Sequence, residues 1–156
     1  MLNKKASKFK KSTSLMISCC MAASIIQIVN TKTVMAEEVE PYVLSLNRTV
    51  YSSSDNGGST SDKLVDGDYT TRWESDWGKE NQWLYVDLGS LAEITGVKIK
   101  WENAYATEYD IEVSDDEENW ISIYTQKDGE GGEENISLNG KGRYVRLNLN
   151  KKFFED

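Results

Sequence analysis

The sequence predicts an all-β domain, and the expected architecture is a β-sandwich. Short segments rich in β-branched and aromatic residues recur along the chain, separated by polar, glycine-containing turns. Apolar and polar residues alternate clearly at 97–102 and 109–114, as they do in strands with one buried face and one hydrated face. No window shows a sustained helical period. These three observations favour sheets over helices.

The expected strands follow one another at short intervals. Three segments between them have turn composition: the polar loop Ser52–Ser59, the hairpin connection Ser114–Asn119 and the glycine-rich loop Asp128–Gly132. Strands are expected around Val43 and at 49–51, 83–88, 94–101, 109–113, 120–124 and 144–149. Within these segments, Trp73, Trp83, Trp101 and Trp120 lie in or beside strand patterns, so core packing is expected for each of them.

Residues 1–36 are predicted to be a secretory signal peptide. A lysine-rich start is followed by a mostly apolar stretch from Leu15 to Val29, and Val34-Met35-Ala36 has the small-residue spacing of a cleavage site. The apolar stretch is too short and too polar for a membrane span of roughly 20 residues. Lipid attachment at Cys19 or Cys20 is an alternative to cleavage. Both cysteines of the chain lie here, so the mature protein would hold no disulfide.

Cleavage after Ala36 would leave residues 37–156, which is a suitable length for one domain with one core. The whole chain has a net charge of −8, and the mature part would keep 12 basic and 26 acidic side chains, a net charge of −14. This balance excludes nucleic acid as the main partner and disfavours a membrane surface, since both require a basic face. It suits cations, neutral sugars or amino sugars, and it equally suits a simple solubility role.

The segment Lys63–Trp73 is a candidate calcium loop. Calcium binds six to eight oxygen ligands, and this loop offers the Asp66 carboxylate, main-chain carbonyls near Gly67 and the Thr71 hydroxyl. An ordinary Asp-Gly turn is the alternative explanation. The acidic run 115–118 lacks the spacing of a calcium site and is expected to be a solvated hairpin tip.

Two aromatic residues are candidates for sugar binding. Trp77 lies in a polar loop between the acidic residues Glu74 and Asp76 on one side and Lys79 on the other, where no core face is evident. An exposed indole could stack on the C–H face of a sugar while the carboxylates bind its hydroxyl or ammonium groups. Alternatively, the indole folds back over the end of the sandwich. Tyr105 is the second candidate platform, with the loop Gly129–Glu134 as a further wall.

Several motifs together resemble a discoidin, or coagulation factor 5/8 type C, domain. The opening signature is matched by Leu64-Val65-Asp66-Gly67-Asp68 with Thr71-Arg72-Trp73, and the second signature by Gln82–Gly89. The segments Asn47–Thr49, Trp101–Ala106, Tyr109–Ser114 and Arg143–Leu147 complete the pattern. The chain is most similar to the bacterial branch classed as carbohydrate-binding module family thirty-two, including modules carried on secreted chitosanases and β-glucanases.

The resemblance implies an eight-stranded jelly-roll sandwich with a structural calcium ion and a shallow sugar site on loops at one end. By position, it assigns the calcium ligands to the carbonyls of Lys63 and Asp68, the Asp66 carboxylate and Thr71. Family members continue past the position of Asp156 with a closing strand, so the chain is expected to lack its last strand and to come from a longer parent protein.

The function expected from these observations is a secreted, non-catalytic module that attaches an enzyme or a cell to polysaccharide. Two other classes remain open. One is a fragment of an extracellular glycoside hydrolase whose catalytic domain is missing, because the chain has acidic residues but no histidine or nucleophile motif. The other is a protein or phospholipid adhesion module, which the acidity disfavours.

Overall fold

The computed structural model describes residues 24–30 and 42–153. Described residues form an antiparallel all-β domain, which confirms the all-β part of the predicted fold class, while the eight strands and the lack of a closing strand stay predictions. The strands are β1 (Ser24–Asn30), β2 (Tyr42–Val43), β3 (Thr49–Ser52), β4 (Gln82–Lys100), β5 (Ala106–Ser114), β6 (Ile121–Gln126) and β7 (Glu133–Lys152). A short 3₁₀ turn, η1 (Ser61–Leu64), overlaps the start of the candidate calcium loop. Among these residues, no helix is long and apolar enough to cross a membrane.

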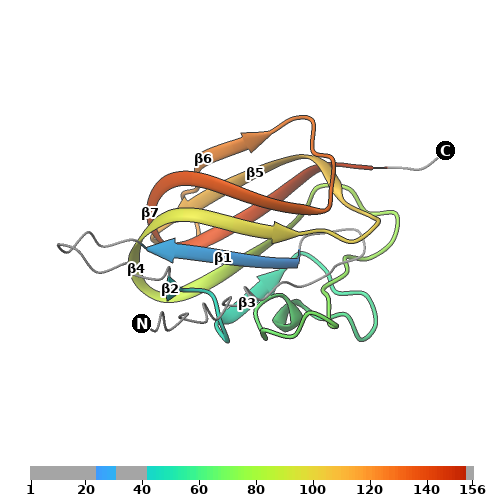
Figure 1. Ribbon diagram of the computed structural model, residues 1–156, viewed down its shortest axis with the longest axis horizontal. Helices are drawn as coiled ribbons and strands as arrows, with labels where there is room; N and C mark the ends of the chain where they lie inside the picture. Colours follow the sequence, from blue (N-terminus) through green and yellow to red (C-terminus); the bar gives the residue numbers. More distant parts are fainter. Residues whose placement is uncertain (1–23, 31–41, 154–156) are drawn as a thin grey trace, which may run out of the picture.

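Two long strands organise the whole domain. β4 and β7 pair with each other over nearly their full lengths, and Figure 1 shows both of them curving back at the same end of the molecule. The first half of β4 also pairs with β3, and its second half pairs with β1. β5 and β6 extend the sheet on the other side of β7, in the order β2-β1-β4-β7-β5-β6. The bent sheet therefore encloses its core between its own two halves.

The bend in β4 is built from a glycine and a register shift. Gly89 has a φ of +81°, a conformation that favours glycine, and the pairing with β7 is interrupted between Asp87 and Ala92. On β7, Gly140 and Gly142 lie opposite this region, and an added Cβ at Gly140 would come within 2.5 Å of Ile123. The strands can approach each other closely at the bend because Gly140 and Gly142 have no side chains.

The predicted alternation correctly identifies the buried face. Val97, Ile99 and Trp101 are buried, and so are Tyr109, Ile111 and Val113. They join Leu84, Val86 and Leu88 from the first half of β4 and Val145, Leu147 and Leu149 from β7 in one hydrophobic cluster. Burying side chains of this size stabilises the fold by roughly 1.5–3 kcal/mol each.

The four tryptophans expected in the core divide into two pairs. Trp73 and Trp101 are buried, as predicted. Trp83 and Trp120 are only half-buried, because they lie on the outer face of the sheet around Tyr85. The stacking of Trp83 on Tyr85 continues to Tyr51 on β3, whose ring centroid is 5.0 Å from that of Tyr85. Aromatic cross-strand pairs explain why strand-like tryptophans need not be core residues.

The strand β1 falls inside the segment predicted to be a signal peptide. Its backbone pairs with β4, for example Gln27 with Lys98 and Ile28 with Val97. This pairing does not decide whether the segment is removed, so cleavage stays a prediction. The proposed cleavage site at 34–36, Cys19 and Cys20, and residues 154–156 lie outside the described residues.

Candidate functional site

The loop between η1 and β4 is anchored to the core by Trp73. Its indole is fully buried, and Nε1 donates hydrogen bonds to the carbonyl oxygen of Ser54 at 3.0 Å and to Oδ1 of Asp55 at 2.8 Å. The backbone N–H of Asp76 also donates to Oγ of Ser54 at 3.0 Å. These bonds fix the starting point of the polar segment that carries Trp77.

Trp77 projects into solvent and is held in place by Glu74. The side chain is 75% exposed, so it does not fold back over the sandwich. Its Nε1 donates to Oε1 of Glu74 at 2.7 Å. Such a hydrogen bond leaves the indole faces free to stack while restricting the orientation of the ring.

Glu74 is a support for the site rather than a free carboxylate. It is only 7% exposed, and Oε1 accepts a second hydrogen bond from Nδ2 of Asn56 at 3.0 Å. The Arg72 guanidinium lies 3.7 Å from Oε2. With three donor groups around it, Glu74 positions Trp77 and Arg72. Because Asn56 is distant in the sequence, the spacing within the loop did not predict this role.

Asp76, the second acidic residue of the predicted site, is half-buried and pairs with Lys79. The Lys79 Nζ lies 2.6 Å from Oδ2 of Asp76. An exposed ion pair of this kind is weak, at about 0–1 kcal/mol, and a ligand can displace it. Asp76 is therefore near Trp77 in the sequence but already has a cationic partner.

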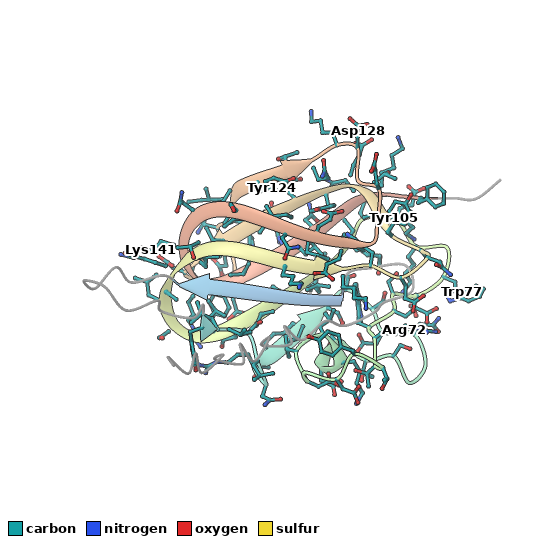
Figure 2. All side chains as sticks on the ribbon, viewed as in Figure 1. Arg72, Trp77, Tyr105, Tyr124, Asp128 and Lys141 are labelled. Carbon is teal, nitrogen blue, oxygen red and sulfur yellow. The ribbon has the colours of Figure 1, made fainter. Side chains whose placement is uncertain are left out.

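Tyr105 lines an open hollow at the same end of the molecule. Figure 2 shows Arg72, Trp77 and Tyr105 at one end of the sandwich and Lys141 at the other. The hollow has a volume of about 650 Å³, within the range of small-ligand sites. Its walls are Trp101, Glu102, Asn103, Tyr105, Glu130, Gly132 and Phe153. Glu130 and Gly132 belong to the loop Gly129–Glu134, so this loop does line the hollow, and its part in sugar binding stays a prediction.

The ring of Tyr105 is closely packed on its protein side. It stacks on Phe153 with ring centroids 4.6 Å apart and an angle of 9° between the planes. A Cβ added to Gly131 would lie only 2.7 Å from Cδ1 of Tyr105, so the loop passes directly against the ring. Tyr105 and Phe153 together form the apolar wall of the hollow.

Three backbone hydrogen bonds fix the segments that form the walls of the hollow. The N–H of Trp101 donates to the carbonyl of Gly132 at 2.7 Å, and the N–H of Phe153 donates to the carbonyl of Tyr105 at 2.9 Å. The N–H of Gly129 donates to the carbonyl of Thr107 at 2.8 Å. The hollow is thus preformed, which lowers the entropic cost of binding.

The hollow has two acidic residues, of which the sequence did not single out Glu102 and included Glu130 only as part of the loop Gly129–Glu134. Glu102 directly follows the buried Trp101, and Glu130 lies on the glycine-rich loop. Glu134 does not line this hollow, but it holds the buried Trp101, one of the hollow's walls: Glu134 accepts hydrogen bonds from Nε1 of Trp101 at 3.0 Å and from the hydroxyl of Tyr109. Burial raises the pKa of Tyr109 well above its ordinary value, so the phenol stays protonated as a donor.

The candidate calcium loop brings three of its predicted oxygen donors together. Oγ1 of Thr71 lies 2.8 Å from Oδ2 of Asp66 and 3.0 Å from the main-chain carbonyl of Asp68. The Asp68 side chain turns away, because its Oδ1 accepts bonds from the N–H and hydroxyl of Thr70. Lys63 lies in η1, and its Nζ is 3.6 Å from Oδ2 of Asp62.

These donors fit a hard cation, because they are oxygens gathered within about one ligand–ligand distance of each other. Within the described residues, no group of three or more histidine, cysteine or acidic side chains is placed to hold a metal. A calcium ion in this loop would therefore use main-chain carbonyls and the Thr71 hydroxyl beside the single carboxylate of Asp66.

Comparison with known proteins shows which domain family and which solved structures this chain resembles. The model of the F5/8 type C domain family matches residues 49–153. Chitosan-binding module 2 of a chitosanase/glucanase from Paenibacillus sp. IK-5, solved in complex with chitotriose, is 38% identical; the match covers 71% of this chain and 89% of that one, with a TM-score of 0.69. Module 1 of the same enzyme is 39% identical, with coverage of 71% and 88% and a TM-score of 0.68. The chain thus resembles non-catalytic binding modules of glycoside hydrolases.

Two further matches are more limited. CpGH89CBM32-4 of Clostridium perfringens, solved with GlcNAc-α-1,4-galactose, is 18% identical with a TM-score of 0.65, over 80% of this chain and 88% of that one, and supports the fold alone. The polysaccharide lyase 8 family protein HylA of Enterococcus faecalis is 43% identical over 72 residues, which is 46% of this chain. The chain spans only 5% of the length of that curated relative.

Proposed function

Because the chain belongs to the F5/8 type C domain family, we propose that it is a non-catalytic carbohydrate-binding module for an amino-sugar polysaccharide of the chitosan type. The observation that carries the proposal is the combination, at one end of the sandwich, of the exposed Trp77 indole with a preformed, acidic hollow beside Tyr105. The likeness to a module solved with chitotriose supports the ligand class.

The proposed binding mechanism combines stacking with charge. Glucosamine units present C–H faces that pack against aromatic rings, and Trp77, Tyr105 and Phe153 offer such rings. Each unit also carries an ammonium group, for which Glu102 and Glu130 are carboxylate partners in the hollow. A neutral sugar could use the rings and donate hydroxyl hydrogen bonds to the carboxylates, but only an amino sugar would also form ion pairs with them, so the acidic lining favours an amino sugar.

We also propose that calcium holds the loop between η1 and β4 in shape. The Asp66 carboxylate, the Thr71 hydroxyl and the carbonyls of Lys63 and Asp68 would bind the ion, which supplies positive charge that links these oxygens. The close spacing of Asp66, Asp68 and Thr71 supports this assignment. The ion would stabilise the loop that leads to Trp73 and Trp77 without touching the sugar.

The proposed biological setting is extracellular. A signal peptide at 1–36 would export the chain, and the module would tether a larger enzyme or the cell surface to polysaccharide. A single shallow site buries little area and should bind modestly. Linkage to other modules would raise the overall affinity by increasing the effective concentration at the second site.

Substitution of Trp77 tests the proposal directly. Unmodified protein and the Trp77→Ala variant are titrated with chitotriose and with its N-acetylated counterpart in a calorimeter. Leu91→Ala is the matched control, because Leu91 is also a large exposed side chain (52%) but lies in the bend of β4. We expect Trp77→Ala to weaken binding about tenfold or more, a loss typical of an aromatic anchor, and Leu91→Ala to leave it unchanged.

Two results would contradict the proposal. One is a lack of binding of the unmodified protein to either oligosaccharide. The other is equal affinity of the Trp77→Ala and Leu91→Ala variants, which would remove the indole from the site. Binding to anionic vesicles in place of sugars would favour the phospholipid adhesion class instead.

A further inference from the structure

A second hollow adjoins the one beside Tyr105, and Glu130 lines both of them. Its volume is about 400 Å³, which is also within the range of small-ligand sites. It extends along the side of the domain, where β6 ends and β7 begins. Its walls are Tyr124, Gln126, Asp128, Glu130, Gly131, Glu133, Glu134, Asn135 and Ile136.

The floor of the second hollow includes an aromatic ring that is held in place. Tyr124 is half-buried on β6, and its ring centroid lies 6.3 Å from that of the fully buried Tyr109. The hydroxyl of Tyr109 donates to Glu134, another wall residue. Tyr124 therefore rests on a fixed part of the core and presents a ring at the surface of the hollow.

The charges around this ring divide into satisfied and available groups. Glu133 pairs with Lys98 at 2.5 Å, and Glu134 accepts hydrogen bonds from Trp101 and Tyr109. Within residues 42–153, the exposed carboxylates of Asp128 and Glu130 form no ion pair. Two carboxylates with no ion pair among the described residues thus line the same hollow as this ring, and one of them also lines the first hollow.

We infer that an amino-sugar chain bound in the first hollow continues past Glu130 into the second, where Tyr124 and Asp128 contact a further cationic unit. This inference rests on the proposed function and extends it from one site to a track across two adjoining hollows. A chitosan chain suits such a track, because each of its units has an apolar sugar face and an ammonium group. The aromatic rings and carboxylates of the track are partners for these two features. The Gly129–Gly132 loop, fixed by its backbone bonds, separates the two positions.

The test compares oligomers of different length on matched variants. Glucosamine trimer and hexamer, and the N-acetylated hexamer, are titrated into unmodified protein, Asp128→Lys and Asp115→Lys. Asp115 is the control, because it is also an exposed aspartate and its reversal changes the net charge equally, but it precedes β6 whereas Asp128 follows it. A hexamer can also bind more tightly simply because a single site can hold it in several positions along its length. This gain is the same for all three proteins, so it does not affect the comparison between them.

We expect the glucosamine hexamer to bind unmodified protein more tightly than the trimer does. Asp128→Lys should reduce hexamer affinity by about threefold to tenfold more than Asp115→Lys does, since it replaces an attraction with a repulsion. Trimer affinity should change equally in both variants. The N-acetylated hexamer should show no specific loss with Asp128→Lys, because it lacks the ammonium groups.

The outcomes separate this inference from the proposed function. If the trimer binds through Trp77 but Asp128→Lys and Asp115→Lys change hexamer affinity equally, the second position is wrong and the first site stands. If Tyr124→Leu, which keeps an apolar side chain against Tyr109, leaves hexamer affinity unchanged, the ring has no part in binding and the track is overturned. If neither oligomer binds unmodified protein, both proposals fail.

Discussion

The contact between Gly131 and Tyr105 allows the candidate site to be disturbed without removing any group from it. In a Gly131→Ala variant, the new Cβ would lie 2.7 Å from Cδ1 and 2.9 Å from Cγ of Tyr105. Real Cβ atoms do not approach a ring this closely, so the ring has to move. Because Tyr105 stacks on Phe153, the movement also disturbs the second aromatic residue of the hollow.

Gly132 provides the matched control for this substitution. Gly131 and Gly132 have φ values of +72° and +70°, so alanine is strained by a similar amount at either position, but a Cβ at Gly132 has no atom within 4 Å. A left-handed conformation costs an alanine about 1–2 kcal/mol, and the loss of glycine freedom in the unfolded chain offsets about 0.4–1 kcal/mol of this. The net destabilisation common to both variants is then about 1 kcal/mol.

Thermal unfolding followed by circular dichroism measures the common part of the effect. We expect both variants to melt roughly 4 °C or more below unmodified protein, with the larger decrease for Gly131→Ala because of the added clash. Calorimetric titration with chitotriose measures the part specific to the site. Gly131→Ala should bind about tenfold more weakly, a loss of about 1.4 kcal/mol. Gly132→Ala should lose clearly less affinity, because its new methyl group meets no atom and leaves the ring of Tyr105 in place, although Gly132 itself lines the hollow. Equal affinities of the two variants would refute the assignment of Tyr105 to the site.

Two other predictions concern the calcium loop and the sheet. Added calcium should raise the melting temperature, with a stabilisation of about 2.7 kcal/mol at a hundredfold excess over the dissociation constant. Asp66→Asn should abolish this rise and Asp68→Asn should keep it, since residue 68 would bind through its carbonyl; an unchanged melting temperature in unmodified protein would exclude the ion. Bidentate hydrogen bonds from Arg143, at 2.9 and 2.8 Å, hold the pKa of Asp87 below its ordinary value of 3.8. A lowered folded-state pKa adds stability above the unfolded-state value, and that stability is lost as the pH falls through the folded-state value. The stability difference between unmodified protein and Asp87→Asn should therefore be full at neutral pH and close below pH 3.8 in chemical denaturation; a gap independent of pH would contradict this.

Local alternation was sufficient to predict the fold class and most of the buried face. It identified Val97, Ile99 and Tyr109 as inward-facing, because burial on one side of a strand leaves a period of two in the sequence. It did not reveal that the segments 83–88 and 94–101 are halves of one strand, since Gly89-Ser90-Leu91 resembles a turn. Only pairing with β7 carries the strand through that bend.

The glycine-containing first half of β7 was missed for a related reason. Gly140 and Gly142 weaken any strand signal, and their small size is explained by the close approach of Val113 and Ser114 from β5 and of Ile123 from β6. A sequence pattern cannot report such an approach, because the partners are distant along the chain.

The residues of the candidate site also differ in whether local sequence or long-range packing reveals them. Trp77 could be found because an aromatic residue stands in a polar loop, and its exposure agrees with that argument. Glu102 and Phe153 could not, because the hollow forms only where the loop Gly129–Glu134 meets Tyr105. The sequence contains one hint about Glu102. It follows Trp101, the last buried residue of the alternating pattern, so its side chain is expected to point outward at the end of a strand.

The central claim is that the end of the sandwich carrying Trp77 and Tyr105 binds an amino-sugar chain. Nuclear magnetic resonance of the ¹⁵N-labelled chain during titration with chitotriose tests it most directly, because the indole Nε1–H of Trp77 is a single probe bonded to Glu74. We predict that this resonance shifts progressively, together with the backbone amides of 102–105 and 130–132. Shifts confined to other parts of the domain, or no shifts at saturating chitotriose, would contradict the account.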